Sequence, residues 1–192
     1  MIIAEHKKKT NIAEYVLYMW QIEDMIRANN FDIKEIEKNI ISKFSQAPQI
    51  ITNIKNWYLN IIEMMNAESK RESGHLQIVN NIIIDLADLH TSLLKSPNEQ
   101  EYLSLYQRAL PEIKEFQIKF RGIAINDIEL CFNGLYFILL LRLQKREITK
   151  ATSDAILTFS NLISHLSQKY HKRNVINSKS AVGSRRSSVD KV

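Results

Sequence analysis

The stretch that most constrains the fold is LYFILLL, residues 135–141, where seven apolar residues follow one another before Arg142. It belongs to a longer apolar segment, residues 130–143, which Asn133 and Gly134 also interrupt. A bilayer-spanning helix needs roughly 20 predominantly apolar residues, so this segment is too short and too interrupted to cross a membrane. A helix that is apolar on nearly all sides is instead surrounded by other helices. We therefore predict a central buried helix over about residues 127–146 of a water-soluble protein.

The rest of the chain shows the same preference for helices. Apolar residues recur at three- and four-residue steps and predict helices that start near residues 11, 32, 48, 75, 96, 127 and 149. The chain contains only four Gly and three Pro residues, which favours long helices and few turns. We expect an all-α fold, namely an antiparallel bundle of six to seven helices around the central one.

Two local signals concern the helix that starts near residue 96. Ser96 as N-cap, Pro97 as the first helical residue and Glu99 as the closing acid form the clearest helix start in the chain. Pro111 lies inside the same predicted helix. Its ring clashes with the preceding turn, so we expect the helix to kink or restart there.

Charge separates the chain into a neutral part and a basic tail. Residues 172–192 hold six of the 26 basic residues and one of the 21 acidic ones, which accounts for the whole net charge of +5. This segment is rich in Ser, Lys and Arg and nearly lacks large apolar side chains, so we predict that it is disordered. Residues 1–171 then form a single helical domain. A neutral domain has no basic field to attract nucleic acid, so binding of DNA or RNA is expected only through residues 172–192.

The lone cysteine, Cys131, excludes an internal disulfide and suits a reducing compartment. The first residues, MIIAEHKKKTN, contain no apolar core of signal-peptide length. We therefore expect a cytoplasmic protein.

Three charged or titratable residues fall on apolar helix faces. At about 100° per residue, Glu23, His90 and Arg142 each lie within the apolar arc of a different predicted helix. A buried charge must be paired, so we expect Glu23 and Arg142 to meet, with His90 close to one of them. Trp20, Arg27 and His75 are the expected flanking residues. Such a cluster either fixes the helix register, with Arg142 reaching solvent from its helix end, or forms a binding or catalytic site.

No motif points to a catalytic residue, a cofactor or a metal ion. The chain has no phosphate-binding glycine loop, no nucleophile elbow and no paired cysteines. One Glu-x-x-His spacing, Glu72 to His75, spans Gly74 at an expected helix break, so it does not suit the inward-facing motif of di-iron bundles. Asp85 and Asp88 lie one turn apart on one side of a helix, where they are either solvated or hold a cation.

Several long blocks carry a resemblance to a known family: NIAEYVLYMWQIEDMIRANN, NWYLNIIEMM, GHLQIVNNIIIDLADLHTSLLKSP, ALPEIKEF and IELCFNGLYFILLLRLQKREI. Over roughly residues 1–171 the chain resembles a bacterial family of the Bacteroidetes, domain of unknown function 4924. The resemblance implies a cytoplasmic, all-helical protein and brings no reaction, ligand or catalytic residue. The basic tail lies outside it.

Three functions remain open on the sequence. The first is a non-enzymatic bundle that acts through protein–protein contacts, either as a homo-oligomer or with another protein. The second is a bundle that binds a small molecule or metal, or an enzyme, with Glu23, His90, Arg142 and His75 at its site. The third is a nucleic-acid-associated protein that uses the tail.

Overall fold

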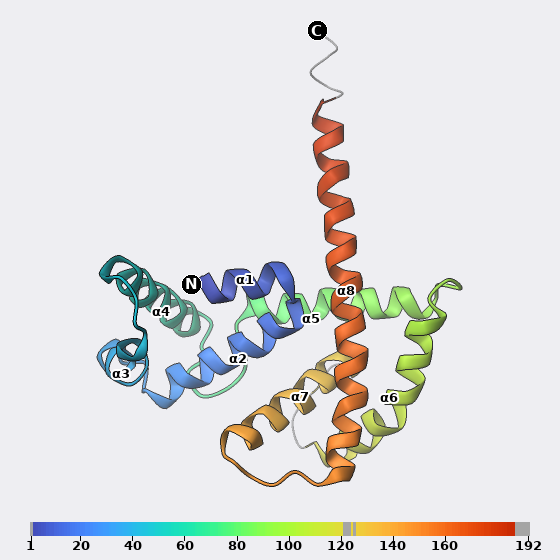
Figure 1. Cartoon of the computed structure of the whole chain (residues 1–192), viewed down its shortest axis with the longest axis horizontal. Coiled ribbons are helices and arrows are strands. Elements are labelled where there is room, and N and C mark those ends of the chain that lie inside the picture. The colour runs from blue at the N-terminus through green and yellow to red at the C-terminus, as the bar shows by residue number, and fades with distance from the viewer. Residues whose placement is uncertain (1, 121–123, 125, 187–192) are drawn as a thin grey trace. The chain divides into compact units, whose positions relative to one another are not determined.

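The computed structural model describes residues 2–120, 124 and 126–186, with side chains up to residue 175, and all its regular elements are helices (Figure 1). They are α1 (Ile2–Thr10), α2 (Ile12–Ala28), α3 (Ile33–Asn39), the 3-10 helix η1 (Ile41–Lys43), α4 (Pro48–Ala67), α5 (Gln77–Leu94), α6 (Gln100–Lys119), α7 (Asp127–Leu143) and α8 (Lys150–Arg186). The predicted all-α class is confirmed. The spacing of apolar residues does not predict α1, which precedes the first predicted helix.

The chain divides into two compact units. Unit 1 comprises Met1–Lys9 and Glu14–Ile82, and unit 2 comprises Thr10–Ala13 and Ile83–Val192. The division falls inside α2 and inside α5, so each of these helices contributes to both units. That residues 1–171 form one domain stays a prediction.

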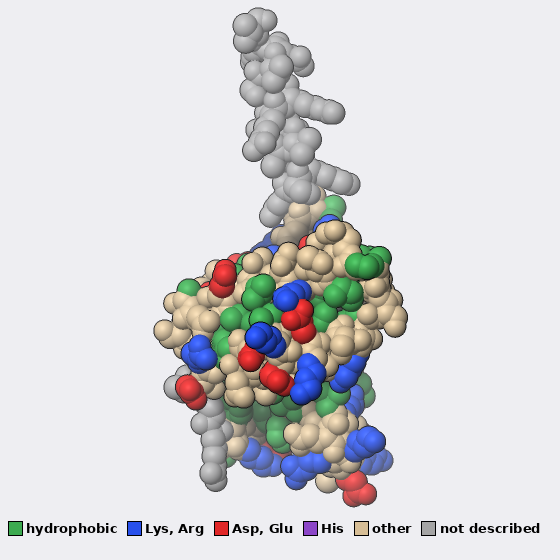
Figure 2. Space-filling view, turned by 90° about the vertical axis from the view of Figure 1, so that its left-hand side faces the viewer, with side chains coloured by type: hydrophobic (Ala, Val, Ile, Leu, Met, Phe, Trp, Pro, Cys, Tyr) green, Lys and Arg blue, Asp and Glu red, His purple; other side chains and the backbone are tan. Residues whose placement is uncertain are grey.

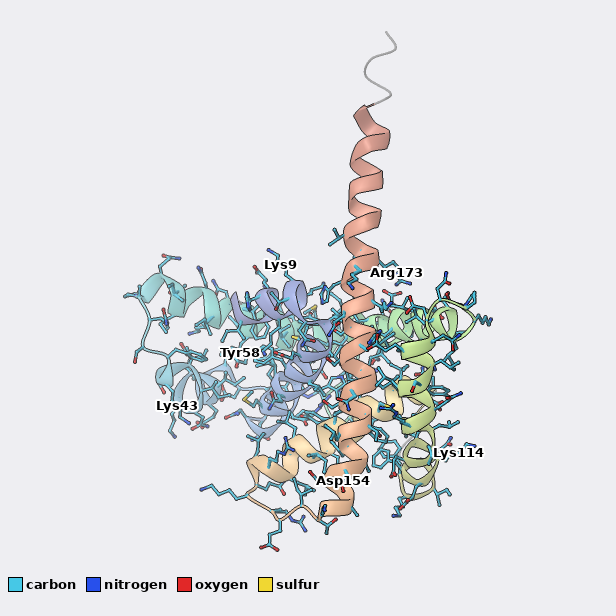
Figure 3. All side chains as sticks on the ribbon, turned by 45° about the vertical axis from the view of Figure 1, so that its right-hand side comes forward. Lys9, Lys43, Tyr58, Lys114, Asp154 and Arg173 are labelled. Carbon is cyan, nitrogen blue, oxygen red and sulfur yellow. The ribbon has the colours of Figure 1, made fainter. Side chains whose placement is uncertain are left out.

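Unit 1 is built on the apolar faces of α2 and α4. The buried residues of both helices follow the three- and four-residue spacing of the sequence: Val16, Met19, Ile22 and Ile26 in α2, and Ile54, Tyr58, Ile61 and Met65 in α4. Tyr58 lies in the interior of the unit (Figure 3). Asp32 caps α3 by accepting a hydrogen bond from the backbone N–H of Lys34 at 2.8 Å. Pro48 opens α4, where its missing N–H costs no hydrogen bond.

In unit 2, α8 packs against both α6 and α7, which also contact each other. The predicted central helix is confirmed as α7, because buried residues cover most of the circumference of its first three turns: Ile128, Leu130, Cys131, Phe132, Gly134, Tyr136 and Ile138. Gly134 permits the close approach of α8. A Cβ atom at this position would lie 2.9 Å from two ring carbons of Phe159.

The helix α8 is longer than the sequence predicts. It continues to Arg186, well past the predicted end near residue 171, and passes beyond α6 and α7 (Figure 1). Extending a formed helix costs far less than nucleating one, which explains why the basic segment continues it. The segment SRRSS, residues 184–188, suggests a phosphate-binding or phosphorylation site from its sequence, and its last two residues lie outside the described residues with the rest of 187–192.

Some predicted helix boundaries are wrong. The start of α6 is Gln100, preceded by Glu99 without a side-chain cap, and Ser96 and Pro97 lie in the turn before it. Glu99 instead accepts a hydrogen bond from Lys169 of α8 at 2.7 Å, so a tertiary ion pair replaces the predicted capping box. The helix α6 continues through Pro111 as one element, so it does not restart there, and the predicted kink at Pro111 stays a prediction. The sequence also predicts that Gly122 ends this helix, because glycine is the usual left-handed stop, but Gly122 lies outside the described residues.

Among the residues that the structure describes, none of the helices has the length and apolar content needed to cross a membrane, as predicted. Charges of both signs are interspersed on the end of unit 1 that carries α3 and α4 (Figure 2). Lys55 pairs with Glu37 at 2.8 Å there, and Lys38 lies 3.9 Å from Glu35. This face therefore presents no field of one sign.

Candidate functional site

One side of α2 holds the connection between α4 and α5. Glu23 is completely buried, and its Oε2 atom lies 2.7 Å from Nδ1 of His75. Its Oε1 atom accepts a hydrogen bond from the backbone N–H of Leu76 at 3.2 Å, immediately before α5 begins. The N-terminus of a helix favours a negative charge, so this buried carboxylate is stabilised by both partners.

Arg27, one turn further along α2, holds the same connection. Its guanidinium donates hydrogen bonds to the carbonyl oxygens of Lys70, at 3.2 Å, and of Gly74. It also pairs with Asp24 at 2.7 Å. Gly74 has φ = 82°, a left-handed conformation that suits glycine, so its backbone follows a path that most residues disfavour. Glu23 and Arg27 together fix residues 70–76.

His75 is more accessible than Trp20, Glu23 and Arg27. Its ring stacks on Trp20 with centroids 4.1 Å apart and an interplanar angle of 11°. About a quarter of its side chain is exposed, at 25%. Because Nδ1 faces Glu23, the other ring nitrogen is the one that a ligand or proton donor could approach. The structure thus brings together four of the predicted site residues: Trp20, Glu23, Arg27 and His75.

His90 lies in unit 2 and has a different set of neighbours. It is buried, as its place on an apolar stripe predicts, and its Nδ1 atom lies 2.6 Å from the hydroxyl of Tyr102. The ring of Tyr106 contacts His90 edge-on at 4.8 Å, and its hydroxyl donates to Asp127 at 2.7 Å. Burial lowers the pKa of His90, although the charge of Asp127 opposes this effect. Burial and the bond to Asp127 raise the pKa of Tyr106 to about 12.

The two tyrosines are partners that sequence reasoning misses. Tyr102 and Tyr106 are in phase with the apolar residues of α6, and this spacing alone predicts packing residues. The sequence could have indicated these partners, because the two tyrosine hydroxyls, like the imidazole of His90, lie on an apolar face. A polar group on such a face is expected to be buried and to need a hydrogen-bond partner.

Arg142 is exposed on the last turn of α7, which contradicts its burial and agrees with the alternative in which its side chain reaches solvent. A cation there is favoured by the partial negative charge at the helix C-terminus, and its long side chain reaches solvent. Glu23 and Arg142 belong to different units. Their pairing, and a cluster of both with His90, stays a prediction.

A groove between α6, α7 and α8 offers a ligand-sized space in unit 2. Its volume is about 770 Å³. The walls are mainly apolar and include four phenylalanine rings: Phe116, Phe120, Phe137 and Phe159, with Ile138, Ile156, Ala151 and Ala155. Phe116 stacks on Phe120 at 5.5 Å and contacts Phe159 edge-on at 6.1 Å. We call this space the α6–α8 groove.

Among the described residues, the charged side chains that line the α6–α8 groove are mostly acidic. Glu112, Glu115 and Asp154 line it together with one base, Lys119, and two threonines. Lys119 forms an ion pair with Glu115 on the same helix, which lowers the pKa of that carboxyl group. The groove therefore combines aromatic walls with an excess of negative charge.

Other side chains offer little chemistry. Within the described residues no group of three or more His, Cys, Asp or Glu side chains is arranged to hold a metal ion. Cys131 is buried and forms no disulfide, and burial raises the pKa of its thiol. A buried protonated thiol is a weak nucleophile, so Cys131 acts as a small packing residue.

Comparison with known proteins places the chain in a family without assigning it a reaction. No curated protein and no solved structure matches it. The family model described as Domain of unknown function (DUF4924) matches residues 1–176, nearly the whole chain. The resemblance stated from the sequence is thereby confirmed, and the chain belongs to the DUF4924 family.

Proposed function

We propose that the protein acts by binding, and that the α6–α8 groove holds an apolar organic ligand. The observation that carries this proposal is the size and lining of the groove. Ligand sites occupy about 300–1,000 Å³ and combine apolar and aromatic walls with a few polar groups. The groove has a volume of about 770 Å³ and four phenylalanine rings, and it fits this description.

The walls of the groove support a preformed site. Phe159 is almost fully buried, and its ring is held between Phe116 and the backbone of α7 at Gly134. Phe137 is half exposed, at 51%, and remains available to a ligand. A wall that is already ordered loses little side-chain entropy when a ligand binds, so more of the apolar contact energy appears as affinity.

Titration of the full chain with N-phenyl-1-naphthylamine tests the proposal. The fluorescence of this neutral probe rises in apolar surroundings, and we expect a saturable increase with about one site per chain. Ala151→Trp adds a bulky ring to the groove and should weaken binding about tenfold or more. Ser153→Trp is the matched control, because Ser153 is exposed on the same helix and does not line the groove. An unsaturable signal, or equal binding by the two variants, would overturn the proposal.

Protein–protein contact is the second candidate function. Phe137, Leu143 and Leu157 of unit 2 are more than half exposed, at 51%, 62% and 58%. A contiguous exposed apolar patch is typical of a surface that a partner covers, and we propose that these three side chains contribute to one. Light scattering over a range of concentrations tests self-association. A dimer that dissociates in Phe137→Ser would favour this candidate, whereas a monomer at every concentration would count against a homo-oligomer.

We assign the protein to the cytoplasm. Its only cysteine is the buried thiol Cys131, which suits a reducing compartment. Fractionation of cells that express the full chain checks this assignment, and recovery from an exported fraction would contradict it.

A further inference from the structure

We infer that the ligand of the α6–α8 groove is an apolar amine, that is, a hydrophobic body carrying one positive charge. This inference rests on the proposed function and names the ligand class of the same site. Among the described residues, three carboxylates and one ammonium group line the groove, so these side chains together carry two excess negative charges when all are ionised. This negative charge does not attract a neutral apolar ligand and repels an anionic one, whereas it attracts a cation and so increases its affinity.

The excess charge comes from Glu112 and Asp154. Lys119 already pairs with Glu115, and within the described part of the chain neither Glu112 nor Asp154 forms an ion pair. Glu112 is partly buried on α6, where its carboxylate is less well solvated than on an open surface. Asp154 lies near the start of α8 (Figure 3). The two carboxylates therefore approach the groove from two different helices.

The aromatic walls favour the same ligand. The face of a phenylalanine ring attracts a cation, and the attraction strengthens where water is excluded. Phe116 lies one turn after Glu112 on α6, so an ammonium group that pairs with Glu112 can also reach an aromatic ring. The apolar body of the ligand would then contact Phe120, Phe137 and Ile156, which line the groove and are at least partly exposed. Charge and apolar surface thus select a molecule that has both.

Three compounds of one shape separate the effect of charge from that of apolar contact. They are 3,3-diphenylpropylamine, 3,3-diphenylpropan-1-ol and 3,3-diphenylpropionate, each used to displace N-phenyl-1-naphthylamine from the full chain at pH 7. We expect the amine to bind about tenfold more tightly than the alcohol, and the propionate most weakly. The amine's advantage should shrink in 1 M NaCl, because salt screens partly exposed charges.

Matched variants identify the carboxylates responsible. In the double variant Glu112→Gln/Asp154→Asn, the ratio of the alcohol's dissociation constant to the amine's should fall toward one. Asp88→Asn removes a carboxylate of α5 that does not line the groove, so it should leave the ratio unchanged. Circular dichroism and the melting temperature show that each variant folds.

The outcomes distinguish the two proposals. If the probe binds but all three compounds compete equally, the inference fails and the proposed function stands. If the ratio persists in the double variant, the assignment to Glu112 and Asp154 fails. If a Lys-rich amphipathic peptide displaces the probe and the amine does not, the groove recognises a protein segment and the inference is overturned. If the probe does not bind, the proposed function falls and the inference with it.

Discussion

Oε2 of Glu23 lies 2.7 Å from Nδ1 of His75, and the carboxylate is buried while the imidazole reaches the surface. This pair joins α2, which carries Glu23, to the connection just before α5, which carries His75. Because Glu23 also accepts the N–H of Leu76, one side chain satisfies two polar groups of the connection. Its contribution to stability should therefore be larger than that of a surface ion pair.

Replacing Glu23 with Gln keeps the size of the side chain and removes its charge. We expect the free energy of unfolding to fall by about 1–3 kcal/mol, because charge-assisted hydrogen bonds to a buried group are lost. Urea unfolding followed by circular dichroism measures this change. Glu63→Gln is the matched control, since Glu63 is exposed on α4, and it should shift stability by less than about 0.5 kcal/mol. Equal effects of the two variants would contradict the anchoring role of Glu23.

A double-mutant cycle of Glu23→Gln with His75→Gln measures the pair itself. Residues that share a hydrogen bond show interaction energies of about 0.5–3 kcal/mol, and we expect a value in that range here. A second cycle with Arg142→Met tests the pairing that the sequence suggests. Coupling of Glu23 to Arg142 would support that pairing, and its absence would remove it.

Helical periodicity predicts the helices and their buried faces, but it does not predict which side chains pair by hydrogen bonds or ion pairs. The spacing of apolar residues places Glu23 on the buried face of α2 and His90 on that of α5, because burial of one helix face is a local property. The partner of Glu23 lies in a connection whose path depends on Gly74 and on Arg27, which no periodicity reveals. Likewise, Glu99 suggests a capping box, yet it pairs with Lys169, 70 residues later in the chain.

The groove is also beyond the reach of the sequence. Phe116 falls on one apolar stripe and Phe159 on another, so helical spacing assigns both to the core. A helical wheel shows which side chains share a face, but it does not give the distance between two helix axes. The four phenylalanine rings surround open space because of tertiary packing, which depends on residues in three helices.

Acidification should destabilise the fold through two histidines. His171 of α8 accepts a hydrogen bond at Nε2 from the backbone N–H of Ile12 at 3.0 Å, so this nitrogen must be unprotonated. Burial lowers the pKa of His171, and it lowers that of His90 as well. The unfolded chain then binds more protons than the folded one as pH falls below about 6.5, the ordinary histidine pKa.

Stability is therefore expected to be fully present above about pH 6.5 and to decline toward pH 5. Urea unfolding at pH 7.5 and pH 5.5 measures the decline. In His171→Gln the amide oxygen can still accept the Ile12 hydrogen bond but does not titrate, so the difference between the two pH values should shrink. If both His171→Gln and His90→Gln kept the full decline of the original chain, other groups would be its cause.

Gly134 is the residue whose enlargement should most directly disturb the walls of the α6–α8 groove. Alanine would gain about 0.5–1 kcal/mol of helix propensity over glycine. Its methyl group would meet the Phe159 ring at 2.9 Å, however, and overpacking of a core costs about 1–3 kcal/mol. We expect Gly134→Ala to lower the free energy of unfolding by about 1 kcal/mol.

A compensating change tests this explanation. Phe159→Leu removes the ring that the added methyl group would meet, so the double variant Gly134→Ala/Phe159→Leu should lose less stability than the two single variants predict by addition. Such favourable coupling is expected of residues in contact and would not arise from helix propensity alone. Urea unfolding of the four proteins gives the coupling energy. Strict additivity, or a Gly134→Ala protein that is more stable than the original, would mean that α7 and α8 are not in contact at this point.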